Sequence, residues 1–249
     1  VELQPMDTVA LLSAGSGTGL RKQAGTVFRR DYGVNLAPLS YLGEDADPEG
    51  AAFDLRTDKG ALAAARALDD MESVAGVVFI IDDVLEAKLK NAEDVSSLLK
   101  GFFTVLKTFV DSSARKFATC LFRSNSSCGL SRVLFEGILG MFLSAAHEFS
   151  SVQFRCVRLD QSSDLRDAIR GSLDRSQKVL EMTYRNDSVY TRHGHAAASS
   201  FVGSSTVPLG KDDVVVFSGG AYGITPALAR SLTPFGCKMV FLGLEAEEA

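Results

Sequence analysis

The sequence lacks both a CxxC pair and a dense basic block, and each absence excludes a class of protein. The four cysteines lie far apart, at positions 120, 128, 156 and 237. A zinc site is therefore not expected, and the thiols should be reduced and mostly buried. Lys and Arg total 26 against 31 Asp and Glu, a net charge of -5. Nucleic acid is therefore not an expected partner either.

Long apolar runs are also missing. None approaches the roughly 20 residues that cross a bilayer. The N-terminal stretch VELQPMD carries acidic residues where a signal peptide would be basic. We therefore expect a cytoplasmic protein without membrane contact. Hydrophobic residues make up 46% of the 249 positions, enough for a globular chain with one large core or two modest ones.

Apolar patterning alternates between strands and helices over the first 160 residues. Strands are expected at residues 8–13, 77–81, 116–124 and 152–160, and helices at 20–32, 95–109 and 130–148. A further helix is expected to be capped near Thr57 or Asp58. Strands that alternate with helices predict an α/β fold with a mostly parallel sheet and helices on both faces.

Several residues within these elements have structural interpretations. Phe102, Phe103 and Phe109 keep helical register with leucines and are expected in the core. Gly137 and Gly140 would let their helix lie close on the sheet. Asp82 and Asp83 follow a strand and are expected to cap a helix. The run Arg29, Arg30 and Asp31 is interpreted as a solvated helix end, although a docking patch for an acyl carrier is an alternative.

The composition changes after residue 160. A helix is expected at 164–174 and a hairpin around Asn186 and Asp187, and residues 196–213 have the composition of a linker. His193 and His195 lie in a turn without a third ligand and are interpreted as a solvated hairpin end. We place the domain boundary after residue 206, which gives domains 1–206 and 207–249.

A second β-α unit begins at residue 214. Its strand leads into a glycine-rich turn, and Thr225 and Pro226 are a good helix start because threonine can cap and proline is tolerated in the first turn. Glycines between a strand and a helix N-terminus let the backbone approach a pyrophosphate. The earlier turn, AGSGTGL at 14–20, has no obvious acidic residue after the next strand to hold a ribose, so a plain turn is favoured there.

The stretch VVVFSGGAYGITPALARSL resembles the cofactor turn of short-chain dehydrogenase/reductases, in the form found in ketoreductase regions of type I polyketide and polyunsaturated fatty acid synthases. The stretches GVVFIIDD, GILGMFLSAAHEF and VQFRCVRLD are similar to parts of the non-catalytic structural subdomain of that family. The resemblance implies a Rossmann-like structural subdomain followed by the first β-α-β of an NADPH-binding catalytic subdomain, cut from a multienzyme.

The resemblance also implies a reaction and its partners. The complete domain would reduce a β-ketoacyl group on an acyl carrier protein to β-hydroxyacyl with NADPH. The cofactor-binding residues implied here are Ser218, Gly219, Gly220, Tyr222, Gly223, Ile224 and Leu244. NADPH-using relatives commonly carry arginine where Tyr222 and Leu244 stand. Glu245 could instead hold a ribose hydroxyl, as in proteins that bind NAD.

Catalytic residues are not expected in this chain. Reduction in this family needs a tyrosine followed four residues later by lysine, and none of the five tyrosines has a lysine there. The serines in SNSSCG, 124–129, are interpreted as a loop and cap. A non-catalytic structural or interaction module is thus an alternative, and a free-standing dehydrogenase would need a different acid. The open edge of the second unit predicts self-association or pairing with the first domain's sheet.

Overall fold

The computed structural model describes residues 1–14, 19–42, 51–71, 73–111, 116–123, 129–176, 179–186, 188–192, 209–218 and 224–243. The chain divides into two compact units, Val1–His193 and Gly194–Ala249, and each is described by itself. The boundary predicted after residue 206 lies outside the described residues, as do His193 and His195.

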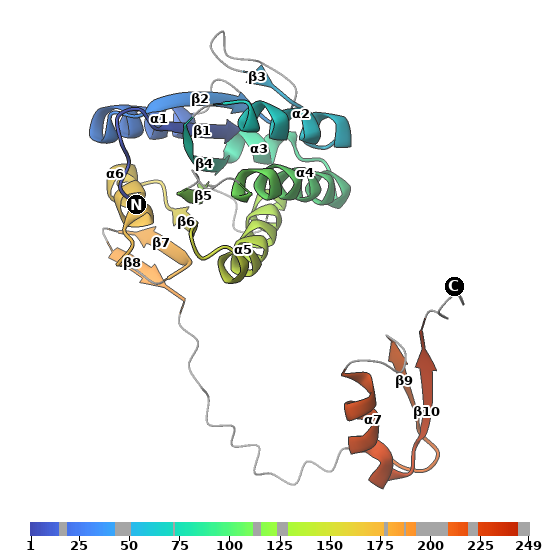
Figure 1. The fold of residues 1–249 in the computed structure, drawn as a ribbon. Helices are drawn as coiled ribbons and strands as arrows, with labels where there is room; N and C mark the ends of the chain where they lie inside the picture. Colours follow the sequence, from blue (N-terminus) through green and yellow to red (C-terminus); the bar gives the residue numbers. More distant parts are fainter. Residues whose placement is uncertain are drawn as a thin grey trace. The chain divides into compact units, whose positions relative to one another are not determined.

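The first unit alternates strands with helices (Figure 1). In chain order its elements are β1 (Thr8–Ser13), α1 (Gly19–Tyr32), β2 (Asn35–Ser40), β3 (Ala51–Ala52), α2 (Asp58–Asp69), β4 (Val74–Ile81), α3 (Asp83–Lys88), α4 (Ala92–Val110), β5 (Phe117–Phe122), α5 (Leu130–Glu148), β6 (Gln153–Leu159), α6 (Leu165–Leu173), β7 (Glu181–Arg185) and β8 (Ser188–Thr191).

All eight strands form one sheet in the order β3-β2-β1-β4-β5-β6-β7-β8. Every neighbouring pair is parallel except β7 and β8, which form an antiparallel hairpin. Asn186 has the positive φ of 47° that a tight hairpin turn favours, whereas Asp187 lies outside the described residues. The predicted Rossmann-like, mostly parallel sheet is confirmed.

Two hydrophobic cores lie on opposite faces of this sheet. On one face α1 and α6 pack through Phe28 and Ile169. On the other face α2, α4 and α5 pack through Leu68, Phe102 and Phe135. The central strand β4 is buried along its whole length because it contributes side chains to both cores. The prediction of helices on both faces is therefore confirmed.

Strand β2, which contains Pro38, was not among the strands predicted from the sequence. The backbone N–H groups of Asn35 and Tyr41 donate toward β1, to the carbonyls of Asp7 and Ser13. The carbonyl of Ser40 instead accepts from Phe53 on the outer side. Alternation places Pro38 on the same outer side as Ser40. Strand β3 pairs only with Leu39 and Ser40, so no neighbouring strand needs the N–H group that Pro38 lacks.

Three side-chain predictions in the helices were wrong. Phe103 is 55% exposed, since it lies one residue beyond the buried stripe that holds Phe102 and Phe109. Gly137 allows a close approach of α4 and not of the sheet: a Cβ there would lie 2.7 Å from a methyl group of Leu99, whereas Gly140 faces open space. Asp31 is not simply solvated, because its carboxylate pairs with Arg166 of α6.

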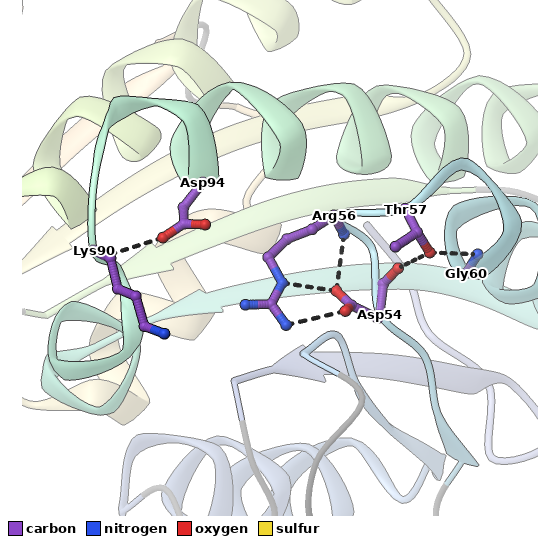
Figure 2. Close-up of polar contacts among 6 residues, drawn as sticks. All are labelled: Asp54, Arg56, Thr57, Gly60, Lys90 and Asp94. Carbon is purple, nitrogen blue, oxygen red and sulfur yellow. Dashed lines mark hydrogen bonds and ion pairs between the residues drawn. The ribbon is translucent and has the colours of Figure 1, made fainter.

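The segment between β3 and α2 lies close to two helices. Figure 2 shows Asp54 accepting hydrogen bonds from the backbone and guanidinium of Arg56, and the hydroxyl of Thr57 capping α2 by accepting from Gly60 N–H at 3.1 Å. The Arg56 hydrogen bonds hold the pKa of Asp54 below its usual range. A Cβ at Gly101 of α4 would lie 2.1 Å from the carbonyl oxygen of Leu55. Only glycine therefore fits where α4 crosses this segment.

The second unit contains β9 (Val214–Ser218), α7 (Thr225–Leu232), a 3₁₀ turn (Thr233–Phe235) and β10 (Lys238–Leu242). Strands β9 and β10 are parallel and paired in register, and Gly236 ends the helical segment with a positive φ of 68°. The predicted β-α-β order is confirmed. Phe217 and Phe241 stack with ring centroids 5.0 Å apart.

The cysteines in the described part of the chain are free thiols. Cys120 and Cys156 are fully buried and opposite one another on β5 and β6. Burial raises the pKa of the Cys156 thiol well above its usual value. Cys237 is also buried, as predicted, whereas Cys128 lies outside the described residues. Among the described helices, none combines the length and apolar character that a bilayer crossing requires.

Candidate functional site

The glycine-rich turn of the second unit is bracketed by two described residues. Ser218 ends β9, and Ile224 directly precedes α7. Gly219, Gly220, Tyr222 and Gly223 lie between them and are outside the described residues, as is Leu244 beyond β10. Because β9 and β10 are parallel, the turn and the chain that leaves β10 emerge at the same end of the two strands.

The N-terminus of α7 corrects one prediction. Thr225 is the first helical residue and not the cap, and the capping position is occupied by Ile224, which is 78% exposed and makes no side-chain hydrogen bond. Pro226 is tolerated in this first turn because its missing N–H group would lack an intrahelical partner anyway. Among the described residues, no side chain at the N-cap position caps the first backbone N–H groups, and N–H groups left open at a helix N-terminus can receive anions.

The first unit has a crevice at its topological switch point. From β1 the chain proceeds outward through β2 and β3, and from β4 it proceeds the other way through β5, β6 and β7. Ligands of open α/β sheets bind where these directions diverge, at the carboxyl ends of the strands. A cavity of about 240 Å³ lies there between the start of α1 and the residues that follow β4, β5 and β6, which include Asp82, Arg123 and Gln161.

Asp82 in this crevice acts as a helix cap. It is only 7% exposed, and its Oδ1 accepts a hydrogen bond from Leu85 N–H at 3.4 Å at the start of α3. The prediction that Asp82 caps a helix is confirmed. Asp83 is the first residue of that helix, where a carboxylate complements the helix dipole.

Arg123 was not identified as a site residue from the sequence, where it falls inside the strand predicted at 116–124; in the structure it directly follows β5. Its guanidinium donates to Gln23 Oε1 at 3.2 Å and to the carbonyl oxygen of Ser163 at 3.5 Å. Burial lowers the pKa of Arg123. Within the described residues, its buried Nε has no hydrogen-bond partner. Arg123 thus gives the crevice a partly desolvated positive charge.

Asp160, which follows β6, is held as a carboxylate. Hydrogen bonds from the hydroxyl of Ser163, with Ser162 and the N–H of Asn186, lower the pKa of Asp160 to about 2. The pKa of Asp160 is lower in the folded chain than in the unfolded chain. These hydrogen bonds therefore stabilise the fold fully at pH values above the unfolded-state pKa, and that stabilisation is lost as the pH falls through about 2.

Titration of Asp160 by carbon-detected NMR is expected to give a pKa near 2. Ser163→Ala should raise it toward the ordinary value of about 3.9, because the largest contribution comes from that hydroxyl. Ser176→Ala, which removes a hydroxyl from a different aspartate, should leave Asp160 unchanged. An unshifted Asp160 in the wild-type chain would contradict the hydrogen-bond arrangement.

The tyrosines in the described part of the chain have structural roles or lie outside the crevice. Tyr41 is buried, and its hydroxyl donates to the carbonyl oxygen of Ile80 at 2.9 Å. Burial raises the pKa of Tyr41 well above the usual value. The Tyr184 hydroxyl donates to the carbonyl oxygen of Asp167 at 3.3 Å. The described residues that line the crevice of the first unit offer charge and hydrogen bonds and include neither a tyrosine nor a lysine.

Metal binding has no support in the described residues, where no group of three His, Cys, Asp or Glu side chains converges. The serines at 124–127 lie outside them. The N-cap position of α5 is occupied by Gly129, so the prediction that one of these serines caps the helix was wrong.

Comparisons with known proteins show the fold. No protein-family model matches the chain, and no curated protein does. A structure with adenylation, ketoreductase and pseudo-Asub domains of a keto acid-selecting NRPS module matches with a TM-score of 0.56 and 12% identity, over 100% of this chain and 22% of that one. An A1-type ketoreductase matches with a TM-score of 0.50 and 19% identity, over 97% of this chain and 49% of that one.

A third similar structure is an alcohol dehydrogenase from the archaeon Thermococcus sibiricus, complexed with 5-hydroxy-NADP. It matches with a TM-score of 0.51 and 13% identity, over 76% of this chain and 100% of that one. The chain thus spans about half of the A1-type ketoreductase and about a fifth of the multidomain structure. At these identities the likeness shows a shared Rossmann-like fold, which dehydrogenases and ketoreductases among these structures have in common.

Proposed function

We propose that the chain is part of the ketoreductase region of a multifunctional fatty acid or polyketide synthase. In this proposal the first unit is a non-catalytic scaffold, and the second unit supplies the turn that binds the pyrophosphate of NADPH. The observation that carries the proposal is the parallel β9-α7-β10 unit, in which a glycine-rich sequence connects Ser218 to a helix whose N-cap residue, Ile224, makes no side-chain hydrogen bond. Glycines before such a helix allow close approach of a diphosphate.

Each residue of the turn has a distinct role in this proposal. Ser218 shapes the start of the turn, and the glycines at 219, 220 and 223 expose backbone N–H groups to the pyrophosphate. Tyr222, Ile224 and Leu244 would contact the nucleotide with side chains that carry no charge. The bound NADPH would supply hydride for a β-ketoacyl group on an acyl carrier protein. The tyrosine and lysine of the reaction would come from other sequence of the synthase.

The exposed face of the second unit supports a partner from the same polypeptide. Val214, Val216, Val240 and Leu242 are each 43% to 56% exposed and alternate with less exposed or helix-facing positions on β9 and β10. Aliphatic side chains that cluster on one face of a sheet are usually buried by another layer. We propose that the remainder of a catalytic reductase lobe covers this face. In the isolated chain, self-association would cover it instead.

A second function is a non-catalytic structural or interaction module. One argument for this module is that no tyrosine in the sequence is followed four residues later by the lysine that the reduction needs. It is also favoured by Tyr222 and Leu244, which cannot pair with a 2'-phosphate as arginine does. In this alternative the glycine-rich turn binds no cofactor.

Calorimetric titration of NADPH and NADH into the chain separates the two functions. We expect NADPH to bind, and Gly223→Val to weaken that binding at least about tenfold, because a side chain prevents backbone approach to the pyrophosphate. Lys100→Gln combined with Lys107→Gln, on exposed positions of α4 in the first unit, is the control and should leave NADPH affinity unchanged. Absence of binding, or binding that Gly223→Val leaves unchanged, would support the structural module.

A further inference from the structure

A groove between α1 and β2 is separate from both sites described above. Its volume is about 570 Å³, within the range of about 300–1,000 Å³ that small-molecule sites occupy. Its basic side chains all come from α1: Arg21 and Lys22 near the start of the helix, and Arg29 and Arg30 in its last turn. None of the described residues that line it is acidic.

The basic side chains of α1 line the groove, whereas its acidic side chain faces α6. Asp31, the only acidic residue of α1, pairs with Arg166 of α6 through two hydrogen bonds of 2.5 and 3.0 Å. It therefore does not neutralise the groove. Among the described residues, the side chains of Lys22, Arg29 and Arg30 are exposed and make no ion pair.

The positions of these charges are not explained by helix stability alone. Arg29 and Arg30 lie at the C-terminus of α1, where the helix dipole favours cations. Arg21 and Lys22 lie in the first turn, where the dipole disfavours them, and that turn holds no acidic residue. Two cations at a helix N-terminus lower the stability of the helix, and the chain as a whole carries a net charge of -5. Residues that lower local stability in this way are typical of functional surfaces.

The floor of the groove between the two basic pairs is apolar. Leu11, Leu36 and Pro38 form it, and Gly25 keeps it open because a Cβ there would lie 3.1 Å from Leu36 Cδ1. The pairs are eight residues apart on the helix, which corresponds to about 12 Å. Pro38 also removes a backbone donor from the outer side of β2, so recognition by strand addition is disfavoured.

We propose that this groove binds a soluble, elongated small molecule with two phosphate groups about 12 Å apart on an apolar body. One phosphate meets Lys22, with the positive charge of the buried Arg21 beside it, the other meets Arg29 and Arg30, and the apolar body lies on Leu11, Leu36 and Pro38. The planar guanidinium groups can donate paired hydrogen bonds to phosphate oxygens. Burial of the apolar floor against the apolar body of the ligand would add binding free energy. This site does not depend on the proposed reductase function.

The test is calorimetric titration of the full chain with inorganic phosphate, hexyl phosphate and hexane-1,6-bisphosphate. The bisphosphate is expected to bind about tenfold or more tightly than hexyl phosphate, and hexyl phosphate more tightly than inorganic phosphate. Arg29→Gln combined with Arg30→Gln should reduce bisphosphate affinity at least about tenfold, to the level of hexyl phosphate. The control, Lys100→Gln combined with Lys107→Gln on exposed positions of α4, removes the same charge and should change affinity less than about twofold.

Three results would overturn the proposal. Equal affinities for all three ligands would mean an adventitious ion only. Equal losses in the two double variants would mean attraction by overall charge. Binding to vesicles of anionic lipid that the bisphosphate does not displace would mean a membrane surface and not a soluble ligand. Because the substituted side chains are exposed, misfolding would not account for any of these results.

Discussion

Gly101→Ala is expected to lower the free energy of unfolding of the first unit by about 3 kcal/mol. The new Cβ would lie 2.1 Å from the carbonyl oxygen of Leu55 and 2.8 Å from its Cβ. Neither atom can move without displacing α4 from the segment that leads into α2. Urea denaturation followed by circular dichroism measures the change.

Gly140→Ala is the matched control for this prediction. Gly140 is also inside a helix, but nothing lies within 4 Å of its Cβ position. Alanine should therefore stabilise α5 by roughly 0.5–1 kcal/mol, since it loses less backbone entropy on folding. Changes of the same sign and size in both variants would contradict the close approach of α4 to Leu55.

Arg158→Met is expected to destabilise the first unit by about 3 kcal/mol. The guanidinium pairs with Glu136 of α5 and donates from Nε to Glu181 of β7 at 2.9 Å, and it lies 4.5 Å from the ring centroid of Phe135. Burial alone would lower the pKa of Arg158, but hydrogen bonds to both glutamates raise it overall. Without the arginine, the mostly buried carboxylate of Glu181 loses its buried partner.

Arg192→Met serves as the control because Arg192 pairs with the same Glu181 at 3.0 Å but is 67% exposed. An exposed ion pair contributes less than about 1 kcal/mol, so this variant should unfold at nearly the wild-type urea concentration. If the two variants were equally stable, Arg158 would not hold α5, β6 and β7 together as described.

Apolar patterning predicted most of the fold because both faces of the sheet are covered. Strand β4 and helix α5 are long and apolar, and their signals did not depend on distant contacts. Strand β2 was missed because the tolerance of Pro38 depends on which side of the strand has a neighbour. The exposure of Phe103 and the contact of Gly137 with Leu99 likewise depend on how α4 and α5 pack together.

The candidate sites could be predicted only where local sequence defines them. The turn after β9 was predicted because a strand, glycines and a helix start are contiguous in the chain. The basic groove was not, since α1 shows its charge separation only when α6 provides a partner for Asp31. Arg123 was missed for the same reason: its contacts with Gln23 and Ser163 join residues far apart in sequence.

Hydrogen–deuterium exchange with and without saturating NADPH tests most directly whether the second unit binds the cofactor. We expect slower exchange in peptides that cover residues 214–224 and 238–244, and this protection should disappear in Gly223→Val. Peptides that cover residues 21–38 of the first unit should not change. Protection confined to residues 21–38, or no protection anywhere, would contradict a cofactor site in the β9-α7-β10 unit.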